Sequence, residues 1–175
     1  MVLQVLIAVV MTYVIGNFTG WVTHWMFHQK WSGKLHEAHE AHHDMYSRGQ
    51  FLSDAYLSTG SNSGTVFFTL FIIPVIAVAF TILMIFGVAW WTYPIILIES
   101  AFVGIIYNRI HDAIHIKNHP YEKYKWFRRL RILHRVHHAN VQTNLGIYEF
   151  SWDRIMKTFR NVTLLKSNHN DRKSY

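Results

Sequence analysis

The 175-residue chain contains no cysteine. This absence excludes disulfides, thiolate-held iron–sulfur clusters and cysteine-based zinc sites, so any bound metal must be held by imidazole or carboxylate groups. Charged residues are also scarce, at 15%, where a soluble domain has about a quarter. Hydrophobic residues make up 51% and gather in long runs, which predicts an integral membrane protein with a single domain over residues 1–175.

Basic residues are absent from two long stretches, residues 1–28 and 65–108, and all 17 Lys and Arg residues lie in residues 29–64 and 109–175. Positive charge marks the cytoplasmic side of membrane proteins, so both basic segments are expected on that face, with the N-terminus outside. The net charge of +7 is attributed to this orientation and to anionic lipid. No basic recognition module or aromatic-interleaved motif occurs, and no nucleic-acid partner is expected.

Three runs are long and apolar enough to cross a bilayer, at about residues 2–24, 65–86 and 90–110. A signal peptide is the competing interpretation of the first run. Neither a basic leading region nor a short apolar core is present, which favours a retained membrane helix. Aromatic residues at Trp90, Trp91 and Tyr93 predict a turn at the far membrane interface between the second and third runs.

The predicted fold is therefore all-α, with about three transmembrane helices and a cytoplasmic-face helical cap formed by residues 29–64 and 111–175. The cap is expected to contain a polar helix, a loop, a basic surface helix and a short interfacial helix, at residues 34–46, 47–64, 121–138 and 151–159. The polar tail from Ser167 is expected to fray. Glu99 is the only acid inside a predicted span. It is expected to lie near an interface or to bond to a neighbouring helix, and a functional role is the alternative.

Ten of the 13 histidines fall into four clusters with helical spacing. Two clusters have the form H-x-x-x-H and two have the form H-x-x-H-H. On a helix, residues three and four apart share a face, so each cluster presents its imidazoles together. The clustered histidines are His24, His28, His39, His42, His43, His111, His115, His134, His137 and His138.

Neutral imidazole is the commonest metal ligand in proteins, and a helix with His at i and i+4 offers two ligands to one ion. Ten ligands are too many for one ion, whereas two ions with four or five imidazoles each would use them. Four such clusters at predicted membrane boundaries argue against coincidence. Imidazole alone suits zinc, copper, iron and nickel, so the spacing leaves the metal open. His36 is left open as a ligand, a supporting group or neither, and His119 and His169 are assigned to the surface.

The four clusters, in their order along the chain, resemble the histidine boxes of the fatty acid hydroxylase superfamily. That group of integral-membrane enzymes includes fatty acyl and sphingolipid hydroxylases, sterol desaturases and bacterial β-carotene hydroxylases. Its pattern is HX3-4H, HX2-3HH, HX3-4H and HX2-3HH, and this chain has H-W-M-F-H, H-E-A-H-H, H-D-A-I-H and H-R-V-H-H. The run N-L-G-I followed by W-D-R-I-M-K-T-F is also similar to the family's ending. The resemblance covers residues 24–159.

The resemblance implies a non-haem di-iron site that activates dioxygen and hydroxylates a long-chain lipid drawn from the bilayer. It assigns the ten clustered histidines as iron ligands, with zinc an expected substitute in purified protein. No fused cytochrome domain is present, so a separate ferredoxin- or cytochrome-type electron donor is expected, with the basic surface around residues 123–135 as its docking site. Imidazole ligands need partners on their free ring nitrogens. The candidates for that role, each with an ordinary surface position as its alternative, are His36, Glu37, Glu40, Asp44, Asp112 and Asn140.

Several alternatives stay open. Within the enzyme class, fatty acyl chains are placed ahead of carotenoids and sterols, and a desaturase with the same metal site is the nearest rival. A metal-transporting or metal-binding membrane protein is a different class, and it would need ligands along a path through the bilayer. A structural membrane module with a decayed site is disfavoured because all four boxes are intact. The oligomeric state and the carbon that is hydroxylated stay open.

Overall fold

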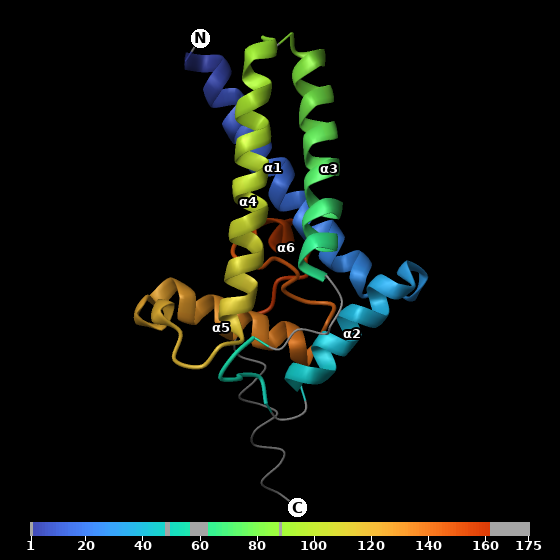
Figure 1. The fold of residues 1–175 in the computed structure, drawn as a ribbon, viewed down its shortest axis with the longest axis vertical. Coiled ribbons are helices and arrows are strands. Elements are labelled where there is room, and N and C mark those ends of the chain that lie inside the picture. The colour runs from blue at the N-terminus through green and yellow to red at the C-terminus, as the bar shows by residue number, and fades with distance from the viewer. Residues whose placement is uncertain (1, 48–49, 57–62, 88, 162–175) are drawn as a thin grey trace, which may run out of the picture. The chain divides into compact units, whose positions relative to one another are not determined.

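A computed structural model describes residues 2–47, 50–56, 63–87 and 89–161, except for the side chains of residues 47 and 63–72. Across these ranges the chain is helical, and the only β-structure is an isolated bridge between Ser53 and Ile116 (Figure 1). The expectation of an all-α protein is confirmed. In chain order the elements are α1 (Val2–Phe27), η1 (Lys30–Ser32), α2 (Lys34–Ser47), α3 (Ser63–Ile85), η2 (Trp90–Thr92), α4 (Tyr93–Ile114), η3 (Pro120–Lys123), α5 (Lys125–Ala139) and α6 (Ser151–Ile155).

The chain divides into two compact units, and the single domain over residues 1–175 stays a prediction. The first unit comprises Met1–Thr23 and Asn62–Arg109, and the second comprises His24–Ser61 and Ile110–Tyr175. All ten clustered histidines belong to the second unit, and 16 of the 17 Lys and Arg residues do too, the exception being Arg109. The apolar runs and the polar chemistry of the sequence are therefore separated into different units.

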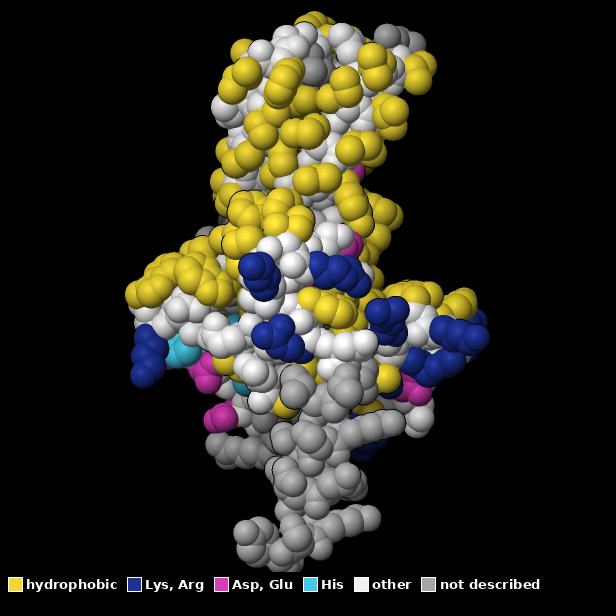
Figure 2. Space-filling model, turned by 180° about the vertical axis from the view of Figure 1, so that it is seen from behind, with side chains coloured by type: hydrophobic (Ala, Val, Ile, Leu, Met, Phe, Trp, Pro, Cys, Tyr) yellow, Lys and Arg dark blue, Asp and Glu magenta, His cyan; other side chains and the backbone are white. Residues whose placement is uncertain are grey.

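In the first unit, α1, α3 and α4 lie side by side (Figure 1). Their shared core is built from small and branched side chains at helical spacing, namely Ala8, Ile15, Val75, Ala79, Leu83 and Ile96. The opposite sides of these helices expose large hydrophobic residues, and on the face that Figure 2 shows, hydrophobic side chains predominate over this unit. A surface of this kind is costly in water and suited to lipid.

Two helices are long and apolar enough to cross a membrane, Val2–Phe27 and Trp90–Ile114. The third expected span, residues 65–86, coincides with helix α3, but its described apolar part is the shorter Ile73–Ile85. Two candidate spans are therefore established, while the third span and the cytoplasmic orientation of the cap stay predictions. The expected turn over residues 87–94 is present, because α3 ends at Ile85, Gly87 adopts a positive φ of 64° and η2 carries Trp90 and Trp91.

Glu99 lies half-buried on α4, and its Oε2 atom has no hydrogen-bond partner among the residues that the structure describes.

The second unit is built around α5, whose apolar residues recur at helical spacing and are buried at Phe127, Leu130, Leu133 and Val136. Such a stripe holds one face of a helix against the core. Basic residues cover the other face.

Two boundaries in the second unit differ from the expected ones. Helix α5 begins at Lys125 rather than residue 121, because Pro120 starts a separate 3-10 turn and Tyr124 is extended. The last helix ends at Ile155 rather than residue 159, because Lys157 adopts a positive φ of 61°. Residues 48–49 and 57–62 of the expected loop and the tail from Ser167 lie outside the described ranges.

Candidate metal centre

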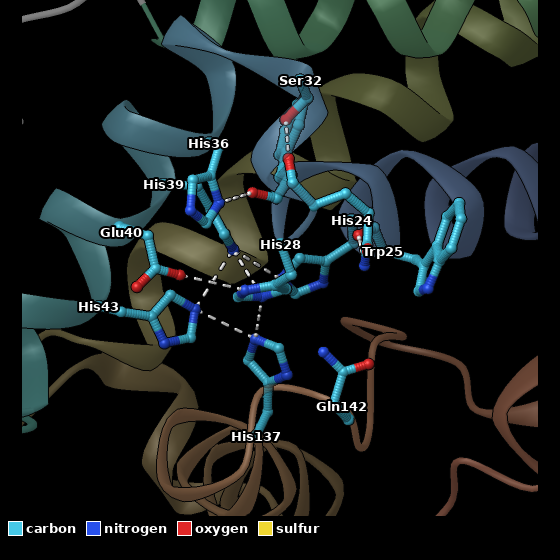
Figure 3. Close-up of polar contacts among 12 residues, drawn as sticks. His24, Trp25, His28, Ser32, His36, His39, Glu40, His43, His137 and Gln142 are labelled. Atoms are coloured by element: carbon cyan, nitrogen blue, oxygen red, sulfur yellow. Dashed lines mark hydrogen bonds and ion pairs between the residues drawn. The ribbon is translucent and has the colours of Figure 1, made fainter.

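Five histidines from three helices converge on one point, and we call them the five-histidine group. Their ligand nitrogens all lie within 4.8 Å of one another. The Nε2 atom of His39 lies 3.0 Å from that of His28 and 3.1 Å from that of His24. Figure 3 shows the imidazoles turned toward one another from α1, α2 and α5. The members are His24, His28, His39, His43 and His137.

Four other histidines form a second convergence, the four-histidine group, made of His42, His115, His134 and His138. The Nε2 atom of His134 lies 3.1 Å from that of His115 and 3.1 Å from that of His138. The Nε2 atom of His42 is buried and has no hydrogen-bond partner among the described residues. A buried ring nitrogen without a partner is the atom that a metal ion would satisfy.

The tenth histidine, His111, stands beside the four-histidine group without being a member. Its ring centroid lies 4.8 Å from that of His42 and 4.9 Å from that of His134. The structure therefore brings all ten predicted ligands into one unit and arranges nine of them in groups that could hold an ion. Their role as ligands stays a prediction. His119 lies apart, with its Nδ1 atom accepting the Tyr121 N–H.

The two H-x-x-H-H boxes each contribute to both groups. In α2, His39 and His43 join the five-histidine group while His42 joins the other, and in α5 the i+3 residue His137 likewise separates from its neighbours. The physical reason is the angle between side chains around the helix axis. Residue i+4 is rotated by about 40° from residue i, whereas residue i+3 is rotated by about 60° in the opposite direction. Helices α2 and α5 therefore tie the two groups together.

Backbone carbonyls fix the tautomers of three members. The Nδ1 atom of His24 lies 2.6 Å from the Leu145 carbonyl oxygen, and that of His137 lies 2.8 Å from the Thr143 carbonyl oxygen. His115 makes the same contact with Phe51 at 3.2 Å. A carbonyl oxygen only accepts, so each Nδ1 carries the proton and each Nε2 presents its lone pair to the group.

This arrangement fits bound metal ions. Two lone-pair nitrogens facing each other repel unless a cation lies between them, and the neighbouring Nε2 atoms are only 3.0–3.2 Å apart. With metal–nitrogen bonds of about 2.1 Å, nitrogens at that separation subtend roughly 90–100° at a shared ion, an ordinary coordination angle. The donor set is all imidazole, which suits iron and zinc alike.

Burial keeps the imidazoles in the state that binds metal. Desolvation, aided by the neighbouring His24 and His36, lowers the pKa of His28 from 6.5 to about 3. Burial is also the leading cause that lowers the pKa of the other members outside the candidate spans, namely His39, His42, His43, His115, His134, His137 and His138. These rings are neutral at pH 7, and neutral imidazole is the ligand form.

The six expected supporting residues divide by position. The Glu40 carboxylate lies 3.5 Å from the Nδ1 atom of His28 (Figure 3). The Asp112 carboxylate lies 3.9 Å from the Nδ1 atom of His111 and also accepts a hydrogen bond from the Tyr56 hydroxyl. The Nδ1 atom of His36 contacts the Phe27 carbonyl at 3.0 Å.

The other three expected supporting residues, Glu37, Asp44 and Asn140, are exposed, as is Glu40. The Asn140 side chain accepts the Gln142 N–H instead of facing an imidazole.

Sequence reasoning missed two buried residues that hold the loop in which the Thr143 and Leu145 carbonyls lie. Asn144 donates to the Leu133 and Arg160 carbonyls at 3.1 and 2.9 Å. Asp153 accepts the backbone N–H groups of Leu145 and Gly146, each at 2.8 Å. The signal was the N-L-G and W-D runs, which were noted only as a resemblance. A carboxylate in a short helix gives no hint in sequence of which backbone amides it will reach.

A comparison with models of known protein families gives a match. A family model described as fatty acid hydroxylase matches residues 9–158 of the chain, a range that contains all ten clustered histidines as well as Asn144 and Asp153. No curated protein and no solved structure matches the chain. The match covers most of the sequence and agrees with the resemblance carried by the four histidine boxes.

Proposed function

Because this chain belongs to the fatty acid hydroxylase family, we propose that it is a membrane di-iron oxygenase that hydroxylates an unactivated C–H bond of a long-chain lipid. The family is one of oxidoreductases, and the apolar helices of the first unit suit a membrane protein. The observation that carries the proposal is the division of nine imidazoles, seven of them buried and two half-buried, into two adjoining groups, each able to hold one ion.

In this proposal the five-histidine group holds one iron, and the four-histidine group with His111 beside it holds the other. A bound iron pair supplies the redox chemistry that activates dioxygen. The chain's own residues do three things. Neutral imidazoles provide lone pairs, backbone carbonyls fix which nitrogen carries each lone pair, and the shared helices α2 and α5 keep the two groups in register. Burial of the rings keeps bulk water away from them.

A lipid substrate follows from where the histidine boxes fall in the chain. The first box begins in the candidate span Val2–Phe27, and the third begins in Trp90–Ile114. The hydrocarbon chain of a lipid in the bilayer would reach the two histidine groups at the membrane boundary without being extracted into water. Fatty acyl chains remain our first choice of substrate, and a cytoplasmic position for the groups follows from the positive-charge bias.

The electron donor is proposed to be a separate acidic ferredoxin or cytochrome. It would dock on the exposed basic side chains along α5, namely Lys125, Arg128, Arg129 and Arg135. Arg131 is excluded from this surface, because it is mostly buried, pairs with Glu122 and donates to the Ile116 carbonyl at 2.7 Å. Complementary charge would chiefly speed association. Arg128→Glu with Arg129→Glu is expected to slow reduction by the donor and to weaken its salt dependence, whereas an unchanged rate would contradict this docking site.

The experiment uses iron-loaded protein in lipid nanodiscs with a chemical reductant and isotopically labelled dioxygen. The expected product is a lipid that has gained one labelled oxygen, and a product that has only lost two hydrogens would indicate a desaturase. His134→Ala removes a buried member of the four-histidine group and is expected to abolish turnover. His119→Ala, which changes a histidine outside both groups, is the matched control and should retain it. Equal activity of the two variants would contradict the proposal.

A further inference from the structure

One peptide group joins a buried carboxylate to a histidine of the five-histidine group. The Leu145 carbonyl oxygen accepts the Nδ1–H of His24 at 2.6 Å. The N–H of the same peptide, which belongs to Gly146, donates to the Asp153 Oδ2 atom at 2.8 Å. The carboxylate and the imidazole therefore hold opposite ends of a single peptide dipole.

The carboxylate is itself held firmly. Asp153 is fully buried, and its Oδ1 atom accepts the Leu145 N–H at 2.8 Å and the Thr158 hydroxyl at 2.7 Å. Thr158 and Phe159 also donate their backbone N–H groups to the Asp153 carbonyl, at 2.8 and 3.0 Å. A buried charge is tolerated when hydrogen bonds of this kind satisfy its oxygens.

Glycine is required at the centre of this contact. A Cβ atom on Gly146 would lie 2.0 Å from the Glu149 carbonyl oxygen and 2.9 Å from the Asp153 carboxylate. No other residue lets the peptide approach the carboxylate so closely. The N-L-G run therefore supplies the peptide of this contact, and the W-D run supplies the carboxylate.

The peptide that accepts from His137 is not bonded to a charged group. The Nδ1 of His137 donates to the Thr143 carbonyl oxygen, and the N–H of that peptide, on Asn144, donates to the neutral Thr158 carbonyl at 3.2 Å. A carboxylate polarises a peptide more strongly than a carbonyl does, and hydrogen bonds in a chain strengthen one another. The Leu145 oxygen is consequently the stronger acceptor of the two.

We propose that Asp153 is a positioning residue of the metal centre, acting on His24 through the Leu145–Gly146 peptide. In many metal sites a carboxylate accepts directly from a ligand histidine, which fixes the ring and raises its basicity. Here a peptide is inserted between the two. The inference rests on the proposed metal centre, and it predicts that the charge of Asp153 supports the five-histidine group and leaves the four-histidine group unaffected.

The test is cobalt(II) binding to the full chain, purified in detergent and stripped of metal, followed by the visible absorption that reports the ligands of cobalt. Asp153→Asn keeps the side chain's size but replaces one acceptor oxygen with a donor NH2, so one of the two backbone N–H groups loses its partner. Binding at the five-histidine group is expected to weaken by about 10- to 100-fold, with an altered spectrum. Binding at the four-histidine group should not change.

Two further variants make the test specific. Glu149→Gln changes a carboxylate in the same loop that accepts from Ser151 and not from the Leu145–Gly146 peptide, so it should bind cobalt like the wild type. Thr158→Val removes only the hydroxyl donor to Asp153 and should weaken the same group to a smaller degree. If Asp153→Asn does not fold, Thr158→Val decides, and wild-type affinity and spectrum in that variant overturn the inference.

The outcomes separate the two proposals. A wild-type chain that binds no cobalt would contradict the proposed function itself. A wild-type chain that binds at both groups, with Asp153→Asn unchanged in affinity and spectrum, would overturn the role of Asp153 and leave the proposed function standing. Equal weakening at both groups would also count against it, because the peptide contacts only His24.

Discussion

Acidification should destabilise the metal-free protein, and His28 allows the size of the effect to be worked out. Its pKa is about 3 in the folded chain and 6.5 when unfolded. Because the folded value is the lower one, the unfolded chain binds the proton first as the pH falls. The stability contributed by neutral His28 is therefore complete above about pH 7 and is lost progressively below pH 6.5. Between pH 8 and pH 5 the loss from this one residue is about 2 kcal/mol.

The assay is thermal unfolding of metal-stripped protein in detergent between pH 8 and pH 5. The midpoint should fall with pH, and a His28→Asn variant should show a shallower fall, by up to about 1.4 kcal/mol per pH unit for the proton removed. Seven further members of the two groups have pKa values lowered in the same direction, so the total slope should exceed that of one proton. A midpoint that does not change between pH 8 and pH 5 would refute the claim that the imidazoles are buried and neutral.

Two predictions concern the scaffold. Leu133→Ala removes a fully buried side chain from the core face of α5 and should lower the free energy of unfolding by about 2–5 kcal/mol. Ile132→Ala, on the exposed face, should change the free energy of unfolding by about 0.5 kcal/mol or less. Equal shifts in the melting temperatures of the two variants would show that α5 is not packed as described. Asn144→Ala should cost about 3 kcal/mol, because its buried side chain makes three hydrogen bonds and its φ of 51° suits asparagine better than alanine. Asn140→Ala is the exposed control, and similar melting temperatures for the two asparagine variants would contradict this assignment.

Helix existence could be predicted from the sequence because the relevant signals are local. The uncharged run that forms α1 and the apolar spacing that buries Phe127, Leu130 and Leu133 are properties of neighbouring residues. The all-α fold and the concentration of histidines in one part of the molecule followed from those signals. The boundary of α5 was wrong by four residues, since the 3-10 turn at Pro120 competes with helix.

Predicting the division of the histidines would have required tertiary information. Spacing alone places His39, His42 and His43 on neighbouring faces of α2, but it does not tell which of them meets α1 and which meets His115 and His134. The expected supporting groups were side chains, whereas backbone carbonyls support His24, His115 and His137. Every residue carries a carbonyl, so sequence cannot single out Leu145, Thr143 and Phe51.

The most direct test of the central claim is the metal content per chain of detergent-purified protein, measured for the wild type and for one variant in each group. His137→Ala changes the five-histidine group, His134→Ala changes the four-histidine group, and His119→Ala is the control. The account predicts about two ions in the wild type and the control, and loss toward about one ion in each of the other variants. Sub-stoichiometric metal that none of the substitutions alters would contradict a two-ion centre.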